Sequence, residues 1–131
     1  NLIDRSHSAP ILQTATQHGV GLLARMPYQR GSLTGKFSPD TQVPPGHRAL
    51  LQRERLADDI AFAERFRELA AQRRGGMAEL AMQYVLDETR LSCTIPGART
   101  VEQVRQNVQA ALGPGLSDRE RDEIARLQGR Q

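Results

Sequence analysis

Apolar residues along this chain follow two patterns, short continuous runs and the wider spacing of amphipathic helices. Continuous runs at 20–24 and 93–95 favour strands that are buried on both faces of a parallel sheet. Leu2 and Ile3 have the character of the end of another strand. Between the runs, apolar residues recur at helical spacing and form one face of each helix. Strands that alternate with helices predict an α/β fold with a parallel sheet and right-handed crossovers.

Start and stop residues place the helices between and after these runs. Helices are expected over 8–18, 57–73, 77–87, 101–111 and 117–127. Gly19 stops the first of them. Thr100 and Gln103 have the spacing of a capping box, and Ser117 and Glu120 have the same spacing. Because a capping box satisfies N–H groups that a helix start leaves unpaired, we expect helices to begin at these two points.

About three strands can be recognised, and one of them is represented only by its end. Three parallel strands do not make a well-covered sheet, so the chain is predicted to be part of a larger α/β domain. A long connection over 25–56 follows the second strand. Compact domains rarely keep a connection of this length unless it binds something, and the alternative interpretation is a floppy insertion.

Charge and hydropathy exclude two classes of partner. The 131 residues carry a formal net charge of +3, which comes from arginines interleaved with Asp and Glu along the helices. This distribution indicates solvated helix faces, because a nucleic-acid surface would cluster the basic residues and interleave aromatic ones. No apolar run approaches the roughly 20 residues of a membrane span. We therefore expect neither nucleic acid nor a membrane as a partner.

Cysteine and histidine usage indicates the redox compartment and whether a metal site is expected. The single Cys93 excludes an internal disulfide and fits a reducing compartment, so a cytoplasmic location is expected. Because Cys93 lies at a strand start, it is expected to be a small buried hydrophobic residue and not a reactive thiol. The three histidines lack the spacing of metal ligands, and no metal site is predicted.

The strand at 93–95 leads into a feature that suits a phosphate. It ends in a turn formed by Pro96 and Gly97, and this turn presents the guanidinium of Arg99 directly before a helix start. A helix N-terminus has unpaired N–H groups and a partial positive charge, to which the arginine adds a full one. A phosphate site at the carboxyl end of a strand indicates nucleotide binding in an α/β protein.

Four segments, together with three single residues, resemble the aldo-keto reductase family. They are Asn1–Arg5, Gly19–Ala24, Arg30–Phe37 and Ile95–Thr100, with Glu102, Gln103 and Asn107. Their order and spacing follow the carboxyl-terminal half of that family's (β/α)8 TIM barrel. The resemblance implies that residues 1–5, 20–25 and 92–97 correspond to strands six, seven and eight. It also implies that residues 1–131 form an incomplete barrel domain whose amino-terminal half is absent.

The same resemblance implies NADPH or NADP as the cofactor, bound in an extended pose without a Rossmann fold. The residues that would bind it are Pro27, Lys36, Arg48, Gly97, Arg99, Gln103 and Asn107. Gly97, Arg99 and Gln103 would lie at the adenosine 2′-phosphate. Lys36 would lie along the pyrophosphate, and Asn107 near the adenine. All of these roles are implied by the resemblance alone.

The family's catalytic Asp, Tyr, Lys and His come from the first half of its barrel, and no segment here matches them. The resemblance therefore implies the cofactor-binding half of an NADPH-dependent oxidoreductase, with no catalytic residue in this chain. Small aldehydes or ketones would be the substrates, and the missing half of the barrel would be a partner. The oligomeric state stays open.

The alternative is a non-catalytic nucleotide-binding or interaction module derived from the same fold. It is motivated by two residues, Arg25 and Met26, which stand where the family usually has a nicotinamide-stacking aromatic residue and a serine. A third departure is Tyr28, where the family usually has leucine.

Overall fold

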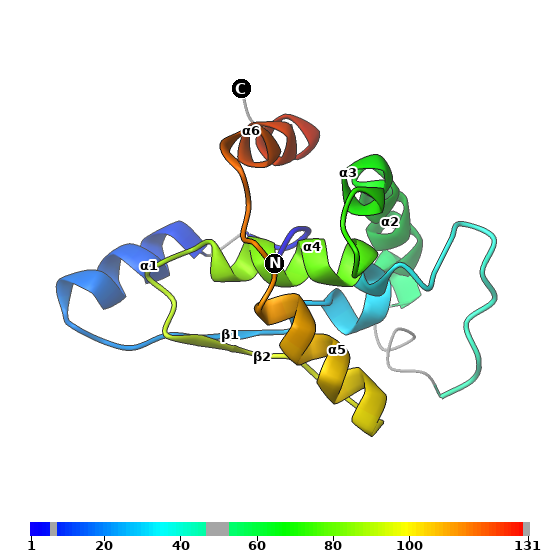
Figure 1. Cartoon of the computed structure of the whole chain (residues 1–131), viewed down its shortest axis with the longest axis horizontal. Coiled ribbons are helices and arrows are strands. Elements are labelled where there is room, and N and C mark those ends of the chain that lie inside the picture. The colour runs from blue at the N-terminus through cyan, green and yellow to red at the C-terminus, as the bar shows by residue number, and fades with distance from the viewer. Residues whose placement is uncertain (6–7, 47–52, 130–131) are drawn as a thin grey trace.

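The computed structural model describes residues 1–5, 8–46 and 53–129. Its elements in chain order are α1 (Ser8–Gln17), β1 (Leu23–Arg25), the 3-10 helix η1 (Gln29–Thr34), α2 (Arg53–Glu64), α3 (Arg67–Ala71), α4 (Gly76–Leu86), β2 (Cys93–Ile95), α5 (Val101–Ala111) and α6 (Asp118–Leu127). Helices α1 and α2 lie at opposite ends of the molecule, with α4 between them (Figure 1). The described residues are mostly helical, with one small sheet.

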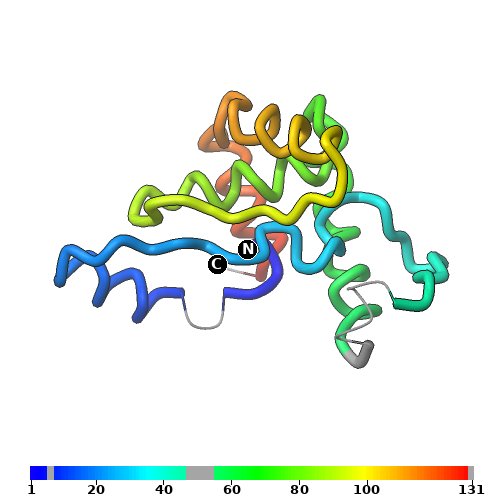
Figure 2. Tube along the Cα trace, turned by 90° about the horizontal axis from the view of Figure 1, so that it is seen from below, coloured from blue at the N-terminus to red at the C-terminus, as the bar shows by residue number. Residues whose placement is uncertain are grey.

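Strands β1 and β2 run side by side and in parallel, as the sequence predicts (Figure 2). The facing pairs are Leu23 with Cys93, Ala24 with Thr94, and Arg25 with Ile95. The hydroxyl of Thr94 donates to the carbonyl oxygen of Ala24 at 3.1 Å and reinforces the pair. The strand expected from residue 20 begins only at Leu23, so the sheet is shorter than the apolar run.

The strand expected at Leu2 and Ile3 does not form. The side-chain oxygen of Asn1 accepts hydrogen bonds from the N–H groups of Ile3 at 3.0 Å and Asp4 at 2.8 Å. These bonds turn the segment back on itself. A strand needs a neighbour for its backbone groups, and β1 has its partner in β2. Leu2 is nevertheless completely buried, so the apolar character of the segment serves the core.

The hydrophobic core surrounds α4, as α4 is apolar on more than one side. The core side chains are Leu2, Leu33, Ala63, Phe66, Leu69, Ala70, Met77, Leu80, Ala81, Leu116 and Ile124. They come from η1, α2, α3, α4 and α6 and from three segments outside these elements. Burial of this apolar surface is the main favourable term that holds these elements together.

The single helix expected over 57–73 is broken at Phe66. The backbone of Phe66 adopts φ −98° and ψ 3°, outside the helical region, and α3 begins at the next residue. The Phe66 ring is completely buried, and its centroid lies 5.6 Å from that of Phe62. Phe66 therefore packs in the core at the point where the two helices meet.

The first part of the 25–56 connection, up to Phe37, is packed against the rest of the molecule. It contains η1, and Gln29, Ser32 and Leu33 are buried. Gly31 has φ +107° and Gly35 has φ +77°, values that glycine adopts without a steric penalty. The interpretation of this stretch as a floppy insertion is therefore wrong for its first part.

One face of the small sheet is open in the described structure. Because alternate residues of a strand share a face, Leu23 and Arg25 lie on the face of β1 that corresponds to Cys93 and Ile95 of β2. Leu23 is 63% exposed and Ile95 is 54% exposed. Cys93 is exposed as well, so the expectation of a buried cysteine is wrong.

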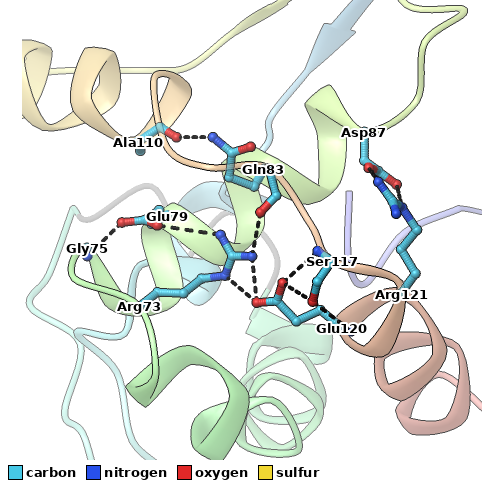
Figure 3. Close-up of polar contacts among 10 residues, drawn as sticks. Arg73, Gly75, Glu79, Gln83, Asp87, Ala110, Ser117, Glu120 and Arg121 are labelled. Atoms are coloured by element: carbon cyan, nitrogen blue, oxygen red, sulfur yellow. Dashed lines mark hydrogen bonds and ion pairs between the residues drawn. The ribbon is translucent and has the colours of Figure 1, made fainter.

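A polar cluster holds α6 against the turn between α3 and α4. The guanidinium of Arg73 donates to Glu120 at 2.6 Å, to the carbonyl oxygen of Gly115 at 2.8 Å and to Glu79 at 3.4 Å (Figure 3). Both reciprocal hydrogen bonds of the capping box between Ser117 and Glu120 are present, which confirms the predicted helix start. Glu120 thus caps its own helix and anchors it.

Candidate functional site

The two segments singled out by the sequence leave the sheet at the same edge. Arg25 and Ile95 form the last pair of the parallel strands. The connection that carries Lys36 and the turn that carries Arg99 therefore begin beside each other. Parallel strands place their carboxyl ends at one edge, where loops of α/β proteins gather ligands. The sheet therefore brings two segments that are far apart in the sequence, with the site residues predicted on them, to one edge.

The start of α5 is capped by Thr100, as predicted. Its side-chain oxygen accepts the N–H of Gln103 at 3.2 Å. The return bond of a capping box is absent, because the side-chain oxygen of Gln103 accepts the N–H of Arg99 at 2.7 Å. Half of the expected capping box is therefore present. The other half has become a bond that fixes the backbone of Arg99 above the helix start.

The turn before α5 is open to solvent. Gly97, Arg99 and Gln103 are all exposed. No atom lies within 4 Å of the position that a Cβ would take at Gly97, so a ligand can approach this backbone closely. The helix end beside it carries partial positive charge. The turn therefore has the access and the charge that an anionic group requires.

Lys36 follows η1 and lies across Gly31. A Cβ at Gly31 would stand 3.1 Å from Cε and 3.2 Å from Nζ of Lys36, so the absence of a side chain makes room for the lysine. The ammonium also lies 4.9 Å from the centroid of the Phe37 ring. Partial burial and the nearby positive charge of Arg99 both lower the pKa of Lys36. The positive charges of Lys36 and Arg99, on separate segments, are thus close enough for one to influence the other.

A hydrogen bond links the two segments directly. The hydroxyl of Tyr28 donates to the side-chain oxygen of Asn107 at 2.9 Å. The side-chain nitrogen of Asn107 donates in turn to the carbonyl oxygen of Gly97 at 3.4 Å. Asn107 is thus a bridge in this structure. In the sequence, Tyr28 is only a departure from a family pattern. No local signal connects it with Asn107, which lies far along the chain.

The segment after β1 has an unusual backbone. Met26, Gln29 and Arg30 have φ values of +54°, +44° and +53°, although none of them is glycine. Such conformations cost free energy, of order 1–3 kcal/mol each, and persist where the surroundings hold them. Pro27, between them, is among the fully buried side chains. The buried ring of Pro27 therefore anchors the segment, and only the backbone of Pro27 could contact a ligand.

Buried side chains hold this strained segment. Gln29 is 3% exposed and donates to Asp59 at 3.1 Å. The side-chain nitrogen of Asn1 donates to Gln29 at 2.9 Å and to the carbonyl oxygen of Met26 at 3.0 Å. The segment is thereby tied to α2 and to the start of the chain. Arg48, also predicted to bind the cofactor, lies outside the described residues.

The structure also contains a cavity of about 540 Å³ next to α1, β1, α4 and α6. It adjoins the start of the segment after β1, because Arg25 and Met26 line it, but its lining contains none of the predicted cofactor residues that the structure describes. The open turn at α5, and not this cavity, is therefore the candidate site.

Two kinds of feature are missing from residues 1–5, 8–46 and 53–129. No helix there is both long enough and apolar enough to cross a membrane. In the same ranges, His, Cys, Asp and Glu side chains do not gather in groups of three or more that could hold a metal ion.

Comparison with known proteins supports the family resemblance seen in the sequence. The sequence profile of the Aldo/keto reductase family matches residues 1–128. The chain is 33% identical to NADH-specific methylglyoxal reductase and 30% identical to L-glyceraldehyde 3-phosphate reductase, both from Escherichia coli K12. Among solved structures, it is similar to the glycerol dehydrogenase AKR11B4 from Gluconobacter oxydans, with a TM-score of 0.77 and 29% identity.

The match covers most of this chain but a minor part of each relative. The alignments include 90% and 95% of the chain for the two reductases and 97% for the dehydrogenase. They include only 36%, 38% and 39% of those proteins. The chain therefore spans well under half the length of these relatives.

Proposed function

Because the chain belongs to the aldo/keto reductase family, we propose that residues 1–131 form the carboxyl-terminal, cofactor-binding part of a (β/α)8 barrel that reduces aldehydes or ketones to alcohols. In this proposal β1 and β2 are strands seven and eight, and residues 1–5 correspond to the end of strand six. The remaining part of the barrel is the partner that supplies the catalytic side chains. A small carbonyl compound is the substrate.

The cofactor in this proposal is NADPH. A bound nicotinamide cofactor would supply the hydride that the reduction requires. Arg99 would pair with the adenosine 2′-phosphate, Gln103 would hold the backbone of Arg99 in place, and Gly97 would allow close approach. Lys36 would lie along the pyrophosphate. Arg48 is assigned to the cofactor side on the family resemblance.

One observation carries the choice of a phosphorylated ligand. Lys36 and Arg99 lie on two segments that leave the sheet side by side and that the Tyr28–Asn107 hydrogen bond joins, and the charge of Arg99 lowers the pKa of Lys36. Like charges repel, and an anion between them would relieve that repulsion. The exposed N-terminus of α5 adds its partial charge at the same place. The donor set therefore fits the phosphates of a dinucleotide.

The choice of NADPH over NADH rests on Arg99. A guanidinium binds a phosphate through two parallel, charge-assisted hydrogen bonds, and NADH has no 2′-phosphate for it. The methylglyoxal reductase relative is named as NADH-specific, so family membership alone does not decide between the two cofactors. The proposal for this chain depends on its own basic residues.

A second candidate is a nucleotide-binding module without turnover. Arg25 is exposed at the end of β1, and Met26 is 37% exposed with a left-handed backbone. These residues replace the aromatic residue and the serine of the family pattern. A cofactor could then bind through its phosphates while its nicotinamide lacks the usual support.

Titration and turnover together test the proposed function. The full natural protein that contains these residues would be titrated with NADPH and NADH by cofactor fluorescence and assayed with methylglyoxal and glyceraldehyde. Arg99→Ala is expected to weaken NADPH about 10- to 100-fold and NADH little, because a charge-assisted hydrogen bond is lost. Arg105→Ala is the matched control, since Arg105 is an exposed arginine on the same helix.

Each outcome has a clear consequence. Binding with carbonyl reduction supports the reductase, and tight binding without reduction supports the module. Equal losses of NADPH and NADH in Arg99→Ala would show that Arg99 does not contact the 2′-phosphate. Failure of the wild-type protein to bind either cofactor would overturn both candidates.

A further inference from the structure

The bond between Tyr28 and Asn107 joins the two halves of the candidate site, and the proposed function gives it no role. Tyr28 belongs to the segment that leads through η1 to Lys36, and Asn107 belongs to the helix that begins beside Arg99. The two residues are 79 positions apart in the sequence. Their contact is therefore a tertiary feature that sets where one segment stands relative to the other.

The partners of Asn107 determine which way its side-chain amide faces. The carbonyl oxygen of Gly97 can only accept a hydrogen bond, so the amide nitrogen of Asn107 faces it. The amide oxygen then faces Tyr28, and the phenol must be the donor. A phenylalanine at position 28 would leave this oxygen without that donor, while the shape of the ring would be kept.

Tyr28 is itself firmly attached to η1. Its carbonyl oxygen accepts the N–H groups of Gly31 at 2.8 Å and Leu33 at 3.1 Å. The side chain is half-buried, and burial raises the pKa of Tyr28 to about 12. The hydroxyl therefore keeps its proton, and its ability to donate, throughout the neutral pH range. A movement of η1 would be transmitted through this side chain to α5.

We propose that Tyr28 is a positioning residue of the cofactor site. Its hydroxyl holds Asn107 and thereby fixes the start of α5, with Arg99, against η1, with Lys36. The same hydroxyl occupies the side-chain oxygen of Asn107, so the amide nitrogen of Asn107 is the group that points toward the open turn at Gly97. The inference rests on the proposed function, since it concerns how the same site is held ready for a phosphorylated adenosine.

The test compares two tyrosine hydroxyls in the full natural protein. Tyr28→Phe removes the bond to Asn107, and Tyr84→Phe removes the hydroxyl that accepts Gln128 at 3.2 Å, away from the site. Adenosine 2′,5′-bisphosphate is the binding probe, and thermal denaturation is recorded for each variant. Tyr28→Phe is expected to weaken the probe about fivefold, as one hydrogen bond is lost. Tyr84→Phe is expected to bind it like the wild type.

Two further readouts separate positioning from general damage. The KM for NADPH should rise in Tyr28→Phe while kcat for carbonyl reduction stays the same, because the number of competent sites is unchanged. In the Asn107→Ala background, Tyr28→Phe should have no further effect, since the hydroxyl acts only through Asn107.

The possible failures are distinguishable. If the wild type binds the probe and Tyr28→Phe binds it equally well, the positioning role is overturned and the proposed function stays intact. A full additional effect of Tyr28→Phe in the Asn107→Ala background also overturns it, as does a fall in kcat with unchanged probe binding. Absence of probe and NADPH binding by the wild type overturns the proposed function and this inference with it.

Discussion

At the scale of single residues, the site depends on how two cations are held close together. Lys36 lies over Gly31, whose lack of a side chain makes the space for it. Arg99 is held through its backbone N–H by Gln103. The two positive charges do not attract each other, since like charges repel. In the proposed site, the backbone of each segment holds its cation in place, and a bound anion would relieve the repulsion between them.

The lowered pKa of Lys36 predicts a pH dependence of binding. An ordinary lysine keeps its charge until the pH nears 10.5, and Lys36 loses its charge earlier because its pKa is lower. Affinity for NADPH should therefore begin to fall at a less alkaline pH than an exposed lysine would give. Dissociation constants measured by fluorescence titration between neutral pH and about pH 10 check this.

Lys36→Arg is the control for that measurement, because a guanidinium stays charged over the whole range. Its affinity should remain flat where the wild type declines. An equal decline in both proteins would assign the titration to another group.

At the scale of elements, α6 depends on a small ionic cluster as well as on the core. The side chain of Arg73 is only 5% exposed, and that of Glu120 is 18% exposed. Burial alone would raise the pKa of Glu120, but hydrogen bonds from Ser117 and Arg73 outweigh it and hold this pKa below its usual value. The ionised form of Glu120 is therefore the one that stabilises the folded state.

Replacement of Glu120 should destabilise the protein in a pH-dependent way. Glu120→Gln is expected to lower the free energy of unfolding by about 1–3 kcal/mol at neutral pH, since Arg73 loses a charged partner. The folded-state pKa is below the unfolded one, so this contribution is complete above the unfolded value and disappears as the pH falls through the folded value. Urea denaturation of the full natural protein at pH 7 and near pH 3 measures the difference.

Glu123→Gln on the same helix is the matched control. Glu123 pairs with Arg126 at the surface, and its side chain is 38% exposed. Surface pairs contribute little, so this variant should stay close to the wild type at both pH values. A Glu120→Gln effect that persists unchanged in acid would contradict the role of its charge.

Several elements could be predicted from local signals, and others could not. The helix over 101–111 and the capping box at Ser117 follow from residues within a few positions of each other. The break at Phe66 and the missing strand at Leu2 depend on what those side chains meet in the core. The site residues were proposed from family resemblance, and their roles in binding a cofactor remain predictions.

At the scale of the whole molecule, considerable apolar surface is exposed. Val101, Val104, Val108 and Leu112 form a stripe along α5 and are each more than half exposed. The open face of the β1–β2 sheet adds Leu23 and Ile95. A two-stranded sheet also has unpaired edges, which favour association with further chain. These surfaces are the ones that the remainder of a barrel would cover in the proposed arrangement.

A polypeptide of residues 1–131 by itself is therefore expected to be poorly stable. It should dimerise, aggregate or lack a cooperative thermal transition, because exposed apolar surface favours association. Light scattering after size-exclusion chromatography and thermal denaturation followed by circular dichroism test this. Paired substitutions of Val104 and Val108 with lysine should reduce the association. A monomer with a sharp transition would contradict the expectation.

The sequence by itself determined the features that act over a few residues: helix starts through their caps, and short strands through apolar runs. Tertiary structure alone decided that Tyr28 bonds to Asn107, that Lys36 stands near Arg99, and that Phe66 interrupts a helix. The physical reason is one of range. Capping and periodicity are satisfied within a turn or two of the chain, whereas contacts between distant segments depend on how the whole core packs.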